Sequence, residues 1–216
     1  MEKDYLNTNY HIAYDKGWRD LKNREPEEIV RNMGVTYFSS NQQFIVPFLN
    51  ENYVIDCSSE MIWQETDGRV PKIGAAILLL HYLSFFQVTA EVTDKWVSLK
   101  EIPNGGILFY PAFYKVAIGG LIKTFGHQPK RLLKCAALLG GRPTSSGTAS
   151  ATFSVFPKIP LCIILWEGDE EISSNATILF DLSIEHFLHT ESIIGLGTYV
   201  AAELVQLASA DTPSIK

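Results

Sequence analysis

Hydrophobic and polar positions change period along the chain, and the first part reads as two helices followed by short strands. Between Tyr5 and Asn23, apolar or aromatic residues stand at positions 6, 10, 13, 14, 18 and 21, the spacing of one face of an amphipathic helix. Pro26, followed by two acids, opens a second short helix that Gly34 ends. Short apolar runs typical of strands follow over 35–39, 43–49, 53–57 and 61–64.

The segment 72–86 is apolar nearly all round, which predicts a helix at the centre of a hydrophobic core. His81 stands within it, and we interpret this residue as a core histidine with one hydrogen bond, the alternative being a ligand role. Four further segments follow: a strand over 96–102, a turn over 103–106, a helix over 110–124 and a basic helix over 129–139. The pair Gly119-Gly120 lies in the helix over 110–124 and indicates either close packing of another backbone or a break in this helix.

Two short apolar runs near the end of the chain, 161–166 and 176–180, are bounded by Pro, Gly and charge, as buried strands are. A carboxylate-rich turn over 167–171 separates them, and Asp181 closes the second run. An alternating strand over 149–156 precedes these runs, whereas a short helix over 183–188 and a long helix over 191–208 follow them.

The order of these elements indicates the fold class, because strands cluster instead of alternating strictly with helices. We therefore predict an α+β fold: a single domain over 1–208, with a largely antiparallel sheet packed with the central apolar helix and flanking helices. Residues 209–216 are expected to form a frayed C-terminal tail.

Composition supports a globular domain, since 46% of the 216 residues are hydrophobic and 19% are charged. The chain does not open on a signal-peptide pattern, and its most apolar run is too short to span a bilayer, so we expect a cytoplasmic protein without a membrane partner. Cys57, Cys135 and Cys162 lack the paired spacing of a local zinc or iron–sulfur site.

The net charge of −6 is unevenly distributed. No acid stands between Glu101 and Glu167, and this stretch contains the bases Lys115, Lys123, Lys130, Arg131, Lys134, Arg142 and Lys158. After Lys158 the only base is Lys216. The cationic middle and the anionic end either face each other in the fold, or the middle binds an anionic ligand or partner. The acidic total argues against a nucleic-acid partner.

Acids and histidines near the end of the chain form one candidate site. If the strand ends converge opposite the cationic middle, Asp169, Glu170, Asp181 and His186 would give a mixed oxygen and nitrogen site for a divalent metal. His189 would share a helix face with His186. Asp181 is equally well placed as the N-cap of the following helix, and the acidic turn is equally typical of a solvated loop. Both interpretations stay open.

Aromatic residues beside bases indicate a second kind of site, because flat faces and positive charge suit a planar anionic ligand. Core packing explains most of the aromatic residues equally well. The loop 140–147 lacks the ending of a phosphate loop and is either a flexible connector or an anion-contacting loop that uses Arg142. The candidate ligand-binding residues are Trp166, Asp169, Glu170, Asp181, His186, Arg142, Lys134 and Tyr110.

No nucleophile elbow and no dinucleotide fingerprint occurs, so the familiar hydrolase, kinase and dehydrogenase classes are not predicted. The sequence leaves open whether the protein is an enzyme.

Several motifs together resemble the DUF3786 family, uncharacterised proteins of anaerobic bacteria and archaea. The most specific are Leu165-Trp-Glu-Gly-Asp-Glu-Glu171 and Ile178-Leu-Phe-Asp181, supported by Leu79-Leu-His-Tyr-Leu83, Gly105-Gly106 and Gly140-Gly141. The likeness covers about Tyr5 to Leu207. The chain departs from the family pattern at Thr148, where Asp is usual, and at Ser192, where an acid is usual; His189 is peculiar to this chain. These departures weaken the expectation of a metal site.

The resemblance implies no established activity, but it implies a setting of corrinoid and one-carbon metabolism, with some members joined to an iron–sulfur domain. We therefore expect a small-molecule- or cofactor-binding or accessory protein, with a corrinoid as the suspected cofactor and a corrinoid or iron–sulfur protein as the suspected partner. One alternative is a metal-dependent enzyme that uses Asp169, Glu170, Asp181 and His186, with Asp169, Asp181 and His186 as the candidate metal ligands. The other is a structural subunit of a redox or methyl-transfer complex.

Overall fold

The computed structural model describes residues 2–88, 90–104 and 106–210, the first seven of these by their backbone alone. The helical elements are α1 (Glu2–Lys22), α2 (Pro26–Met33), α3 (Ile73–Ser84), η1 (Leu99–Glu101), α4 (Gly106–Phe113), the π-helical η2 (Tyr114–Ile118), α5 (Gly119–Phe125), α6 (Pro129–Leu138), η3 (Leu182–His186) and α7 (Thr190–Ala210). The strands are β1 (Thr36–Phe38), β2 (Gln43–Phe48), β3 (Glu51–Asp56), β4 (Met61–Gln64), β5 (Trp96–Ser98), β6 (Arg142–Thr144), β7 (Ala149–Phe156), β8 (Ile159–Trp166) and β9 (Asn175–Asp181).

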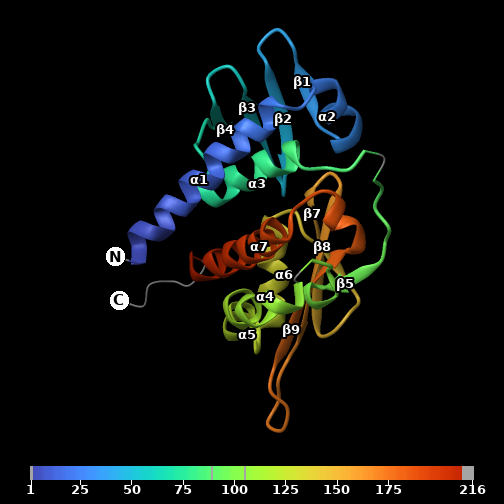
Figure 1. Ribbon diagram of the computed structural model, residues 1–216. Helices are drawn as coiled ribbons and strands as arrows, with labels where there is room; N and C mark the ends of the chain where they lie inside the picture. The colour runs from blue at the N-terminus through green and yellow to red at the C-terminus, as the bar shows by residue number, and fades with distance from the viewer. Residues whose placement is uncertain (1, 89, 105, 211–216) are drawn as a thin grey trace.

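The described strands form two antiparallel sheets (Figure 1), so the predicted α+β class is confirmed, with two sheets in place of one. The smaller sheet has the order β1-β2-β3-β4 and lies beside α1, α2 and α3. Its strand β2 alternates as the sequence predicts: Phe44, Val46 and Phe48 are buried, and the residues between them are partly exposed. This alternation directs one row of side chains of the small sheet into the common core.

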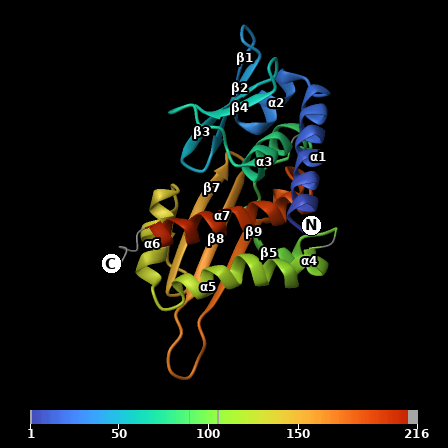
Figure 2. The same cartoon turned by 90° about the vertical axis from the view of Figure 1, so that its left-hand side faces the viewer.

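The larger sheet has the order β5-β9-β8-β7-β6, and α7 crosses one of its faces together with α5 and α6 (Figure 2). Its strand β8 is a continuous apolar run that is buried from Leu161 to Leu165, as predicted for a strand in the middle of a covered sheet. The central helix α3 is confirmed as a core element, since its residues from Ala75 to Leu80 are all buried.

Three predicted segments differ from the structure. The strand expected over 96–102 ends at Ser98, because Ser98 and Glu101 form a capping box that starts η1. The helix expected from Tyr110 begins at Gly106, includes Pro111 and continues through the π-helical η2 to α5. The loop 140–147 is not a wholly flexible connector, since β6 within it pairs with β7, and its alternative role as an anion-contacting loop stays a prediction.

Helix α7 is the one described helix that is long and apolar enough to cross a membrane. Its buried face, which includes Ile193, Leu196, Val200 and Leu204, belongs to the core of the folded domain. This helix extends to Ala210, so the first two residues of the predicted tail are helical, and the remaining six lie outside the described residues.

Candidate functional site

The acid-rich turn and Asp181 lie at opposite ends of one hairpin. Strands β8 and β9 pair with Trp166 opposite Asn175, so the loop that carries Asp169 and Glu170 projects beyond this end of the sheet (Figures 1 and 2). Asp181 ends β9, six residues after Asn175, and six residues of strand span about 20 Å. The expectation that these acids meet is therefore wrong, because the second strand of a hairpin carries the chain away from the turn.

Asp181 caps η3, as one of the two interpretations of the sequence predicts. The side chain is 1% exposed, and its Oδ1 accepts hydrogen bonds from the backbone amides of Ser183 (2.9 Å) and Thr93 (3.0 Å) and from both of their hydroxyls. Burial by itself raises the pKa of this carboxyl, but the four hydrogen bonds outweigh burial and the pKa lies below its ordinary value. Asp181 is thus an ionised structural anchor.

The two histidines do not share a helix face, because η3 ends at His186 and α7 starts only at Thr190. The His186 Nδ1 is buried without a hydrogen-bond partner, whereas the ring of His189 lies 3.7 Å from that of Phe85. Among the described residues, no group of three or more His, Cys, Asp and Glu side chains could hold a metal ion. The structure therefore gives no support to a metal site at Asp169, Asp181 and His186.

The remaining predicted residues are dispersed. Lys134 and Glu167 line an open hollow of about 520 Å³ at the start of α6, where a base of the cationic middle meets an acid of the anionic end. Arg142 is exposed on β6, and the ring of Tyr110 lies under the ammonium of Lys100, 4.2 Å away. Trp166 is 41% exposed at the end of β8. No described cavity brings these predicted side chains together.

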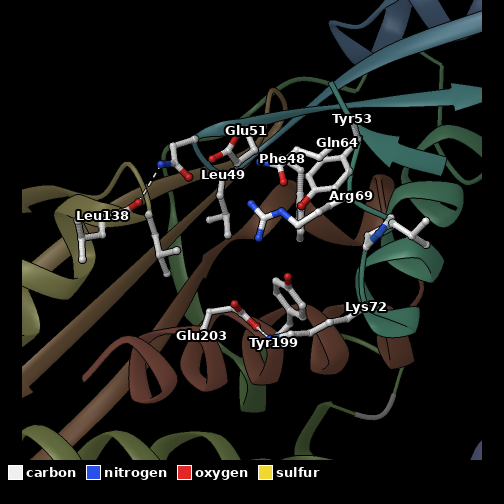
Figure 3. A pocket seen from close by; sticks show the side chains of 14 residues that line it. Phe48, Leu49, Glu51, Tyr53, Gln64, Arg69, Lys72, Leu138, Tyr199 and Glu203 are labelled. Carbon is white, nitrogen blue, oxygen red and sulfur yellow. Dashed lines mark hydrogen bonds and ion pairs between the residues drawn. The ribbon is translucent and has the colours of Figure 1, made fainter. Parts of the chain in front are cut away.

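A different cavity, of about 360 Å³, lies where the two sheets meet α7 (Figure 3), and we call it the junction pocket. Its walls come from the β2–β3 hairpin, the connection between β4 and α3, the end of α6 and one face of α7. Hydrogen bonds hold the hairpin in place: the amide of Leu49 donates to the carbonyl of Val155 (2.8 Å), and Asn50 Nδ2 donates to that of Leu138 (2.8 Å). The pocket wall is therefore fixed to the large sheet and to α6.

Charged side chains of both signs line the junction pocket. The guanidinium of Arg69 points into the cavity, and its Nε lies 2.5 Å from an oxygen of Asp67, which orients it (Figure 3). The Nζ of Lys72 contacts Glu203 at 2.5 Å on the α7 side. Glu51 adds a second carboxylate on the opposite wall. The cavity can thus contact an anionic group and a cationic or hydrogen-bond-donating group of one molecule.

Two tyrosines face this cavity from different elements, Tyr53 from β3 and Tyr199 from α7 (Figure 3). Both rings pack against Phe48, with ring centroids 6.0 and 5.4 Å away. Burial, and then the charge of Glu51, raises the pKa of Tyr53, while burial and the charge of Glu203 raise the pKa of Tyr199. Both hydroxyls therefore stay protonated at neutral pH and can donate hydrogen bonds to a ligand.

Sequence reasoning missed the junction pocket. Tyr53 and Tyr199 lie within elements whose periodicity assigns aromatic residues to the core, and Arg69 lies in a polar connection without a motif. These residues come together only through the packing of β3 and α7, which are far apart in the chain. No local pattern could have identified them.

Comparison with known proteins identifies a family. The family described as "Domain of unknown function (DUF3786)" matches residues 25–203. No curated protein matches the chain, and no solved structure does.

Proposed function

The chain belongs to the DUF3786 family, and from the geometry of the junction pocket we propose that it is a binding protein for a small polar molecule that carries an anionic group. One observation carries this proposal: the guanidinium of Arg69 and the protonated hydroxyls of Tyr53 and Tyr199 converge on one cavity. Such convergence of a few polar groups on a partly apolar cavity is typical of ligand sites.

The chemistry of the lining selects the ligand class. A guanidinium presents two parallel N–H donors that match a carboxylate or a phosphate, and the tyrosine hydroxyls add two more donors. Glu51 and Glu203 favour a ligand that also carries an amino group or other donors. A cavity of about 360 Å³ fits a metabolite of modest size and is smaller than a corrinoid requires. The proposed ligand is therefore a small zwitterion or a hydroxylated acid.

We also propose a cytoplasmic location for the protein. Cys57, Cys135 and Cys162, all within the described residues, are free thiols, which suits a reducing compartment.

A binding experiment with matched arginine variants tests the proposed site. Screening of small carboxylates, amino acids and phosphates by thermal shift and native mass spectrometry should yield a ligand, whose Kd is then measured by calorimetry. Arg69→Gln removes the charge-assisted hydrogen bonds, worth about 1.5–3 kcal/mol, and should raise the Kd about 10- to 100-fold. Arg142→Gln makes the same change on exposed β6 and should leave the Kd unaltered. Equal weakening by both substitutions, or no ligand from the screen, would overturn the proposal.

A further inference from the structure

A second cavity, of about 500 Å³, lies between α1, α3 and α7, and Tyr199 contributes to both this cavity and the junction pocket. We call it the α3–α7 groove. Apolar side chains such as Ile77, Leu78 and Ile194 line most of it. Two glycines also face it: a Cβ at Gly74 would meet no atom within 4 Å, and one at Gly195 would meet only Leu78, 3.9 Å away. The groove therefore has room for an apolar chain beside the helix backbones.

Two polar side chains meet in this groove. The Nδ1 of His81 lies 2.7 Å from the Oγ of Ser192, and Ser192 is 6% exposed. The ring is packed against α1 at Gly17, where a Cβ would lie 3.6 Å from its Cδ2. In the tautomer that carries its proton on Nε2, the ring leaves Nδ1 as an acceptor. In that tautomer the Nδ1 of His81 accepts the hydroxyl proton of Ser192.

The imidazole of His81 is neutral, as a general base must be, although its lowered pKa makes it a weaker base than an ordinary histidine. Burial, and then the neighbouring His189 and Lys16, lowers the pKa of His81 to about 4, so its imidazole is neutral at pH 7. A neutral imidazole beside a hydroxyl is the arrangement that activates serine as a nucleophile. Such pairs are identified by geometry and not by position in the chain, and these two residues are 111 positions apart.

We propose that Ser192 and His81 form a nucleophile and base pair that transfers the acyl group of an apolar ester bound in the α3–α7 groove. The Oγ of Ser192 attacks the ester carbonyl while Nδ1 of His81 takes the hydroxyl proton. The bond from the carbonyl carbon to the alcohol oxygen breaks, and His81 returns the proton to the leaving alkoxide. Water then attacks the acyl-serine with the same proton transfers, which releases a carboxylic acid and restores Ser192.

The position of Ser192 in α7 favours the charge that develops in this reaction. It is the third residue of a 21-residue helix, so it lies in the turn whose amides have no acceptor within the helix. The positive end of the helix dipole lies at the same turn and stabilises negative charge on an attacked carbonyl oxygen. The groove, the oriented histidine and the helix end thus converge on one hydroxyl. The proposal does not depend on the junction pocket.

A covalent probe tests this pair directly. The full chain is incubated with an alkyl fluorophosphonate, and the product is analysed by intact-mass and peptide mass spectrometry. We expect one phosphonyl adduct on Ser192. Ser192→Ala should abolish it, and His81→Gln should slow its formation at least 100-fold. Ser209→Ala, the same substitution on the exposed far end of α7, serves as the matched control and should react normally.

A second variant keeps the test decisive. Gly195→Leu narrows the groove beside the pair, so it should slow a probe with a long alkyl chain much more than one with a short chain. Circular dichroism establishes that each variant is folded. The absence of an adduct on Ser192 in the folded protein, or an adduct rate that His81→Gln leaves unchanged, would overturn the proposal and assign the pair to packing alone.

Discussion

Asp181 is buried and His81 is partly buried, and the pKa values of both are lowered for different reasons. Four hydrogen bonds favour the charged form of Asp181 against the effect of its burial. For His81 burial itself disfavours the charged form. The carboxylate therefore stays ionised and the imidazole stays neutral in the folded protein at neutral pH.

The lowered pKa of His81 predicts a loss of stability on mild acidification. Unfolded histidine binds a proton near pH 6.5, whereas folded His81 resists protonation down to about pH 4. Between these pH values the unfolded state binds more protons than the folded state. The stability that neutral His81 contributes to the folded protein above pH 6.5 is therefore lost as the pH falls towards 4. His189, which also has a lowered pKa and lies near Lys16 and Asp20, contributes in the same direction.

Urea unfolding between pH 7 and pH 4.5 measures this effect. The free energy of unfolding should fall less steeply in His81→Gln, which retains a partner for Ser192, than in the wild type. The exposed residue His11 provides the control, because His11→Gln should leave the slope unaltered. Equal slopes for His81→Gln and the wild type would contradict the assignment of a neutral His81.

Helix α7 contains two glycines, two positions apart, whose surroundings differ. A Cβ at Gly197 would lie 2.8 Å from ring atoms of Phe113 and 3.0 Å from the ring of Phe180, both of which are buried. At Gly195 the nearest atom would be 3.9 Å away. Gly197 therefore permits the helix to approach the core closely, whereas Gly195 leaves space in the α3–α7 groove.

Alanine at these two positions should change stability in opposite directions. Gly195→Ala gains helix propensity without a clash and should raise the free energy of unfolding by up to about 1 kcal/mol. Gly197→Ala gains the same propensity but overpacks the core, and it should lower that free energy by about 1–3 kcal/mol. Urea unfolding of Gly195→Ala and Gly197→Ala measures both changes in the free energy of unfolding. A change of the same sign in both would show that the ring contacts do not constrain α7.

At the scale of the whole molecule, α4 and η2 present a large exposed apolar face. Leu108 is 79% exposed, and Ile107, Phe109 and Val116 beside it are exposed as well. Lys115 lies within η2, and no acid occurs between Glu101 and Glu167. Large exposed apolar faces often mark protein–protein contact sites, and the expectation of a subunit in a larger complex stays a prediction.

Substitutions on this face should alter association without altering the fold. Leu108→Ser removes an apolar side chain that is already in water, so the free energy of unfolding should change by no more than about 0.5 kcal/mol. Self-association at high concentration, measured by light scattering, should decrease. Leu121→Ser is the buried counterpart in α5 and should cost about 3 kcal/mol or more. A large loss of stability in Leu108→Ser would show that this face is packed within the molecule.

The order of elements could be predicted from the sequence, because helix and strand periods are local properties of the chain. The apolar run of α3, the alternation of β2 and the breaks at Gly34 and Pro129 each indicate an element within a few residues of its observed bounds. Segment 96–102 is the informative exception, since a capping box that is equally local ended the strand early. The α+β class followed from the clustering of the strands.

The sites could not be predicted in the same way, because each depends on which elements pack together. Asp169 and Asp181 are close in the chain, yet the pairing of β8 with β9 separates them along a hairpin. Arg69 and Tyr199 are 130 positions apart, yet both line the junction pocket. His81 and Ser192 are also distant in the chain, and both line the α3–α7 groove. The chain by itself determined the helices, the strands and the α+β class, since side-chain periodicity acts over a few residues. Only the tertiary structure decided which charged and hydroxyl groups share a cavity, because burial against distant elements sets both their neighbours and their ionisation.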